Sequence, residues 1–199
     1  MGFAAIILGY LLGSIPFGLV IGKLWAKIDV REYGSGNIGV SNVLRTVGPW
    51  PSLIVLLLDA GKGAAAVLLA RYVFGLDSVW VLLAGVAAIA GHNWPLYLQF
   101  KGGKGVATTA GVIISVSPLV ALIIMLIWVI SLVISRYISI SSMIAALALP
   151  ILFYVLDFSS VYLGLAILVS FFTIVRHVPN IQRLIAGTEY KFGQKVDRN

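Results

Sequence analysis

Three segments of this sequence combine glycines with cationic and amide side chains. The first runs from Arg31 to Gly39 and continues to a further cation downstream. Its candidate anion ligands are Gly34, Ser35, Gly36, Asn37 and Arg45. Glycines let consecutive backbone N–H groups turn toward one anion, and serine and asparagine side chains add further donors. Such a segment is suited to binding a phosphate-type group.

The second and third segments repeat this composition. The second supplies Lys101, Gly102, Gly103 and Lys104 just before an apolar stretch that begins at Val106. A helix that begins there would add its unpaired N–H groups and the positive end of its dipole. The third segment supplies His177, Asn180 and Arg183, and Ser142 is expected to face the same site. Each segment alone is equally typical of a turn or a topology signal, whereas the three together indicate an anion site.

The composition requires lipid as the solvent. Of the 199 residues, 60% are hydrophobic and 11% are charged, against about 45–50% and about 25% in soluble domains. The absence of cysteine excludes thiolate catalysis and structural zinc. The seven acidic residues do not cluster as magnesium ligands do. No metal and no cofactor is therefore predicted, and the net charge of +7 reflects membrane orientation rather than nucleic-acid binding.

Seven apolar stretches predict an all-α integral membrane bundle, with 1–199 as a single transmembrane domain. The expected spans are Gly2–Gly22, Pro51–Phe74, Ser78–Leu98, a short fourth helix over Val106–Val116, Pro118–Ser135, Met143–Leu156 and Val161–Val175. A six-span alternative joins the fourth and fifth into one kinked helix. With seven spans, every Lys and Arg except Lys62 and Arg71 falls on one side. Because cytoplasmic loops carry the basic excess, the N-terminus is expected outside, and the C-terminus and the site in the cytoplasm.

Four polar residues at or within the expected spans have open interpretations. Asp59 and Lys62 lie three residues apart on one face of the second span, where ionisable groups either pair structurally or mark a function. His92 fits an interfacial histidine that is bonded to a backbone carbonyl. Ser141 is expected to be near the N-cap of the sixth span.

The motifs resemble those of the PlsY family, which are bacterial integral-membrane acyl-phosphate:glycerol-3-phosphate acyltransferases. The likeness extends from the first span to about Glu189. It is carried by Ser14–Gly18, Gly34–Gly39 with Asn42 and Arg45, His92–Pro95 with Phe100–Gly105, and Arg176-His177 with Asn180 and Arg183. Ser41 and Val40 are mild departures, standing where Thr and Ala are expected.

This resemblance implies an activity and a location. A fatty acyl group would pass from acyl-phosphate to the sn-1 hydroxyl of glycerol 3-phosphate, giving lysophosphatidic acid and phosphate, the first step of phospholipid synthesis. The expected location is the bacterial inner membrane, with the active site on the cytoplasmic side. The expected partners are the two substrates and membrane lipids, with no nucleic acid and no metal, and the expected assembly is a monomer.

Roles for the candidate residues follow as a hypothesis. Ser35, Gly36, Asn37, Lys104, Ser142 and His177 would hold the phosphoryl group of the donor. Asn180 would polarise the acyl carbonyl, while Arg45, Lys104 and the backbone of the second segment would bind glycerol 3-phosphate. The proton acceptor stays open between the substrate's own phosphate and His177. An anion or phospholipid transporter is the alternative function.

Overall fold

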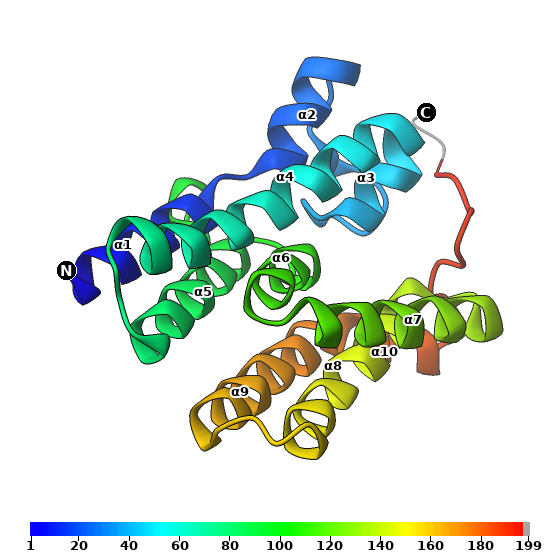
Figure 1. Cartoon of the computed structure of the whole chain (residues 1–199). Helices are drawn as coiled ribbons and strands as arrows, with labels where there is room; N and C mark the ends of the chain where they lie inside the picture. The colour runs from blue at the N-terminus through cyan, green and yellow to red at the C-terminus, as the bar shows by residue number, and fades with distance from the viewer. Residues whose placement is uncertain (197–199) are drawn as a thin grey trace. The chain divides into compact units, whose positions relative to one another are not determined.

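All regular secondary structure in residues 1–196, which the computed structural model describes, is helical (Figure 1). Two compact units divide the described chain, the first comprising 1–115 with 193–196 and the second Val116–Phe192. The first unit contains α1 (Gly2–Ser14), α2 (Phe17–Ala26), η1 (Val30–Glu32), α3 (Val40–Thr46), α4 (Pro49–Leu68), η2 (Leu69–Val73), α5 (Ser78–Asn93), η3 (Leu96–Leu98) and α6 (Val106–Val116). The second contains α7 (Pro118–Ser135), α8 (Ile138–Val155), α9 (Ser160–Arg176) and α10 (Val178–Ile185).

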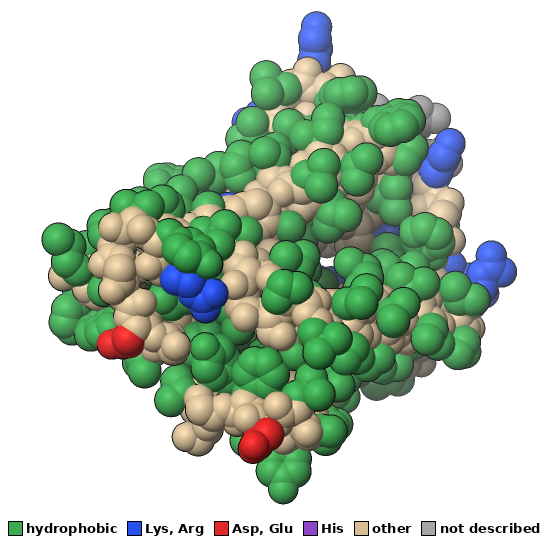
Figure 2. Space-filling view, in the orientation of Figure 1, with side chains coloured by type: hydrophobic (Ala, Val, Ile, Leu, Met, Phe, Trp, Pro, Cys, Tyr) green, Lys and Arg blue, Asp and Glu red, His purple; other side chains and the backbone are tan. Residues whose placement is uncertain are grey.

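The helices confirm the all-α membrane fold. Within the described residues, five helical segments are long and apolar enough to cross a bilayer, or six if the bent pair α9–α10 is one span. The predicted fourth helix has the expected ends, but its 11 residues are too few to count among the five. Figure 2 shows a face covered mostly by hydrophobic side chains, as a lipid-facing surface requires. Arg198, one of the basic residues in the orientation argument, lies outside the described residues.

The first predicted span is interrupted, which corrects the expectation of one continuous helix over Gly2–Gly22. α1 ends at Ser14 and α2 begins at Phe17. Pro16 has no N–H to continue the helical ladder, and the residue before a proline is driven out of the α region. Ile15 accordingly has an extended backbone, with φ −63° and ψ 119°. The break gives the first unit a short non-helical corner between two apolar helices.

Small residues allow the helices of the first unit to approach closely. α1 and α5 lie side by side (Figure 1), and Gly13 of α1 faces the carbonyl of Ala88 in α5 so closely that any Cβ would clash. Gly63 of α4 has the same relation to the carbonyl of Thr108 in α6. Helices pack in lipid largely through such close backbone contacts, because lipid supplies no hydrophobic drive between helices. Gly63, the residue after Lys62, thus permits close contact between α4 and α6.

Two glycines of α4 provide a matched test of this packing. A Gly63→Ala variant is expected to lose about 1–3 kcal/mol of stability, because its methyl group must displace the α6 backbone. Gly61→Ala is expected to be neutral or stabilising by up to about 1 kcal/mol, since nothing lies within 4 Å of its added Cβ and alanine favours helix. Thermal unfolding in detergent measures both, and equal transition temperatures would contradict the packing argument.

In the second unit, α8 packs against both α7 and α9. α8 begins at Ile138, so the expectation of a serine N-cap near Ser141 is wrong. Ser141 and Ser142 lie instead in the first turns and donate backward to the carbonyls of Tyr137 and Ile138, at 3.0 and 2.8 Å. The hydroxyl of Ser142 also accepts a hydrogen bond from the Trp128 indole at 3.2 Å, which fixes its orientation between α7 and α8.

Candidate functional site

The first candidate segment is folded around the buried side chain of Asn42. Its Oδ1 accepts from the backbone N–H of Ser35 at 2.9 Å. Its Nδ2 donates to the carbonyls of Val30 and Tyr33, at 2.8 and 3.1 Å. One amide thus satisfies backbone groups on both sides of the turn, and α3 positions the Gly34–Gly39 loop through it.

Left-handed backbone within this loop explains two of its glycines. Gly34 and Gly36 have φ values of +61° and +68°, which side chains with a Cβ rarely adopt. Asn37 uses its Oδ1 to accept from the N–H of Gly39 at 2.8 Å. The amide nitrogen of Asn37 is therefore the half of the side chain able to donate to an anion, as the sequence analysis expects.

An exposed ion pair precedes the loop. Asp29 caps η1 by accepting from the N–H of Arg31 at 3.0 Å, and the Arg31 guanidinium binds the same carboxylate at 2.6 Å. The hydrogen bond from the Arg31 side chain lowers the pKa of Asp29 to about 2. Asp29 is consequently a weak base at neutral pH, and Arg31 is held at the edge of the loop.

The second segment is folded back onto the end of α5. The N–H of Gly103 donates to the carbonyl of His92 at 2.9 Å. A Cβ on Gly103 would clash with the His92 ring, and one on Gly102 would clash with Pro95 and the His92 carbonyl. Both positions therefore require glycine for space. Lys104, half-buried, follows directly and precedes the first turn of α6.

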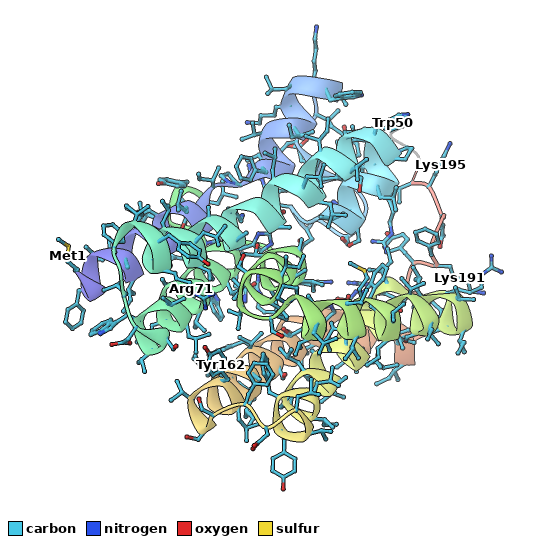
Figure 3. The ribbon with its side chains drawn as sticks, viewed as in Figure 1. Met1, Trp50, Arg71, Tyr162, Lys191 and Lys195 are labelled. Atoms are coloured by element: carbon cyan, nitrogen blue, oxygen red, sulfur yellow. The ribbon has the colours of Figure 1, made fainter. Side chains whose placement is uncertain are left out.

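Lys195 and Arg45 of the first unit lie near the start of α4. In Figure 3, Trp50 and Lys195 lie near each other where α4 begins, while Arg71 lies at its far end in η2. The tail returns to this region through a hydrogen bond from the N–H of Val196 to the carbonyl of Arg45, at 3.3 Å. Arg45 itself is buried in α3.

The third segment lies in the second unit and is assembled around Glu189. The carboxylate of Glu189 accepts from Ser139 Oγ at 2.9 Å, from Asn180 Nδ2 at 2.7 Å and from Arg183 Nε at 2.7 Å. Its side chain is 2% exposed, against 28% for Arg183. α10 thus presents Asn180 and Arg183 to a single buried acid that follows it in the chain.

His177 marks the bend between α9 and α10, and its side chain is buried. Its Nδ1 lies 2.7 Å from the carbonyl oxygen of Thr173. Because a carbonyl only accepts, Nδ1 carries the proton. Nε2 has a lone pair when the ring is neutral and can donate to a phosphate oxygen only when the imidazole is protonated. The backbone N–H of Asn180 donates to the carbonyl of His177 at 2.8 Å, so the two side chains share one helical turn.

The comparisons with known proteins agree on one family. The family model described as glycerol-3-phosphate acyltransferase matches residues 3–187. The chain belongs to this family. A glycerol-3-phosphate acyltransferase from Desulforamulus reducens is 49% identical over 191 residues, covering 96% of this chain and 95% of the relative. One from a Synechococcus species is 47% identical over 188 residues, covering 94% of each.

Solved structures give the same result. A crystal structure of PlsY (YgiH), an integral membrane glycerol 3-phosphate acyltransferase, in its glycerol 3-phosphate form superposes with a TM-score of 0.91. It is 41% identical and covers 96% of each chain. The lysophosphatidic acid form superposes with a TM-score of 0.89. This glycerol-3-phosphate acyltransferase family member is therefore a multi-pass membrane acyltransferase, as the sequence predicts.

Within this family member, each unit contains part of the predicted site. The first unit holds the residues of the first two segments, namely Gly34, Ser35, Gly36, Asn37, Arg45, Lys101, Gly102, Gly103 and Lys104. The second holds Ser142, His177, Asn180 and Arg183, the last two on one carboxylate. Glu189 is not among the site residues predicted from the sequence. Its contacts with Asn180 and Arg183 form only when the chain that follows α10 folds back onto this helix.

Stability of the second unit is expected to depend on the ionisation of Glu189. Burial alone would raise its pKa, but hydrogen bonds from Asn180, Arg183 and Ser139 outweigh burial and hold the pKa below its usual value of 4.5. The stabilisation is therefore complete above pH 4.5 and is lost as the pH falls through the lower folded pKa. Thermal unfolding of wild-type protein and Glu189→Gln between pH 7 and pH 3 measures this. Identical pH profiles would contradict it.

Proposed function

We propose that this chain transfers a fatty acyl group from acyl-phosphate to the sn-1 hydroxyl of glycerol 3-phosphate. The products are 1-acyl-glycerol 3-phosphate and inorganic phosphate, and the reaction is the first step of phospholipid synthesis. The observation that carries the proposal is the likeness, over 96% of the chain, to a structure in a glycerol 3-phosphate form and another in a lysophosphatidic acid form. These two molecules are the acceptor and the product of the proposed reaction.

The proposal includes a topology and an assembly. Seven spans place the N-terminus outside and the C-terminus in the cytoplasm, within the bacterial inner membrane. The position of Arg71 at one end of α4, opposite Trp50 and the basic tail, supports this orientation. The two units act as one domain, since the family match runs from residue 3 to residue 187 through both of them. The proposed assembly is a monomer.

The two phosphates are bound by different sets of residues, drawn from all three segments. Ser35, Gly36, Asn37, Lys104, Ser142 and His177 hold the phosphoryl group of the donor. Glycerol 3-phosphate is held by Arg45, Lys104 and the backbone of Gly102 and Gly103, with Lys101 and Arg183 as further substrate-binding residues. The support is the rigid Asn42-centred turn in the first unit and the steric fit of the glycine pair against His92.

The reaction moves one acyl group and one proton. The sn-1 oxygen attacks the acyl carbonyl carbon, the bond from that carbon to the phosphate oxygen breaks, and phosphate departs with the electron pair. Asn180 stabilises the developing oxyanion, and its amide orientation is set by donation to Glu189. The hydroxyl proton passes to a phosphate oxygen of glycerol 3-phosphate. The lowered pKa values of Asp29 and Glu189, which make these carboxylates weak bases, support this assignment.

An assay with purified protein tests the function. In detergent, release of inorganic phosphate from palmitoyl phosphate is expected only when glycerol 3-phosphate is present, with equimolar lysophosphatidic acid formed. Palmitoyl-CoA should not replace the acyl phosphate. Asp157→Asn, a change at an exposed position with a φ of 56° that asparagine tolerates, serves as the active control. Transport of glycerol 3-phosphate into proteoliposomes with no acyl transfer would overturn the proposal in favour of a transporter.

A further inference from the structure

Three ionisable side chains form a buried cluster in the first unit. Asp59 and Lys62 lie one turn apart in α4, and His92 lies at the end of α5. Lys62 Nζ is 2.8 Å from Asp59 Oδ1, and His92 Nδ1 is 3.5 Å from the same oxygen. The three side chains are at most 4% exposed. The Asp59 carboxylate is therefore shared between a cation and an imidazole inside an apolar helix bundle.

The histidine of this cluster is in direct contact with the second candidate segment. The carbonyl of His92 receives the N–H of Gly103 at 2.9 Å. Its imidazole ring occupies the space where a side chain on Gly103 would stand. Any rotation of the ring toward or away from Asp59 therefore changes the surface on which the Gly102–Gly103 backbone rests.

The lysine of the cluster contacts the corner between α1 and α2. Lys62 Nζ donates to the carbonyl of Ile15 at 2.9 Å, which the proline break leaves without a helical partner. The same ammonium lies 5.6 Å from the centre of the Phe17 ring. The next residue, Gly18, packs against the carbonyl of Ile38 within the first candidate segment. Contacts thus run from one anion-binding loop through the cluster to the other.

We propose that Asp59, Lys62 and His92 are positioning residues that hold the Gly102–Gly103 backbone in register to bind the phosphate of glycerol 3-phosphate. This inference rests on the proposed function. Replacing a buried ion pair with apolar residues of similar volume is often neutral or stabilising, so packing alone does not require these charges. An apolar pair cannot orient the His92 imidazole, and the phosphate-binding backbone lies against that ring.

A double variant, Asp59→Asn with Lys62→Met, separates positioning from folding. Both charges are removed because Asp59→Asn alone would leave the buried Lys62 ammonium without its counter-ion. The double variant is expected to keep a cooperative thermal transition close to that of wild type. Its KM for glycerol 3-phosphate should rise about tenfold or more, with kcat and the KM for acyl-phosphate changed less than about threefold, because only one binding loop is displaced.

A second variant and a control complete the experiment. His92→Phe keeps the ion pair and a ring but removes the imidazole nitrogens, and the same selective rise in KM is expected. Asp77→Ala removes the N-cap at the opposite end of α5, where Asp77 accepts from Val79 and Trp80. It should lower the transition temperature by a few degrees without changing either KM. Wild-type KM for glycerol 3-phosphate in either folded cluster variant would overturn the inference, whereas an inactive wild-type enzyme would instead overturn the proposed function.

Discussion

A Glu189→Ala enzyme is expected to lose about two orders of magnitude in kcat/KM. Glu189 orients Asn180 through a 2.7 Å hydrogen bond and Arg183 through another of the same length. Without the carboxylate, the Asn180 amide is released from the orientation proposed for oxyanion stabilisation, and displacement of about 1 Å at such a group costs about 100-fold. Steady-state kinetics with palmitoyl phosphate and glycerol 3-phosphate measure the loss.

Stability should fall in the same variant. Arg183 and Ser139 also lose their acceptor, and hydrogen bonds to a charged group contribute about 1.5–3 kcal/mol. Glu189→Gln should be intermediate, since its carbonyl still accepts from Asn180 while its amide nitrogen opposes Arg183. Asp157→Asn in the same unit is the matched control and should leave kinetics and melting unchanged. A Glu189→Ala enzyme with wild-type kcat/KM would show that Asn180 does not depend on this carboxylate.

Replacing His177 with alanine is expected to lower kcat by about 100-fold, while His177→Gln restores about a tenth of wild-type activity. The proposal gives His177 a hydrogen-bonding role at the donor phosphate, whereas the substrate's own phosphate takes the proton. Glutamine retains a donor and an acceptor but does not titrate near neutral pH. It can also donate to the Thr173 carbonyl, which Nδ1 contacts at 2.7 Å in the native protein.

The pH dependence of kcat distinguishes this role from general-base catalysis. If His177 were the base, glutamine would be as damaging as alanine, with losses of about 10²–10⁴-fold. The rising limb of the pH profile near the pKa of histidine would also disappear in both variants. That pair of results would contradict the substrate-phosphate assignment. A pH profile of His177→Gln that retains the wild-type limb would support it.

Much of the fold follows from local rules that act along one helix at a time. The ends of the helices Val106–Val116 and Pro118–Ser135 agree with the predicted ones, because a proline and short polar links stop apolar runs at defined residues. Pro16 also signals the break at Ile15, but the span is predicted from the hydropathy of a whole window of residues, which does not detect a single proline. The π-helical turn η2 has no comparable signal, since it arises from packing rather than composition.

In the candidate site, too, the local features can be predicted from the sequence, whereas contacts between distant residues cannot. The loop glycines and cations can be recognised from the composition. The hydrogen bonds of Asn42 that fold the first segment into a turn could not be predicted in the same way. The sequence does not identify Glu189 as the partner of Asn180, because Glu189 reaches Asn180 only after α10 and the following turn have folded. The contact of His92 with Gly103 likewise depends on how a loop returns to its own helix.

The pairing of α1 with α5 bears on how the chain is assembled as it is made. Gly13 meets the Ala88 backbone, so α1 has its principal neighbour about 75 residues later in the chain. The backbone hydrogen bonds of α1 are made within the helix, so α1 is stable in the bilayer before its partner is present. The close pairing of α1 with α5 can therefore form only once α5 has been synthesised and has entered the membrane.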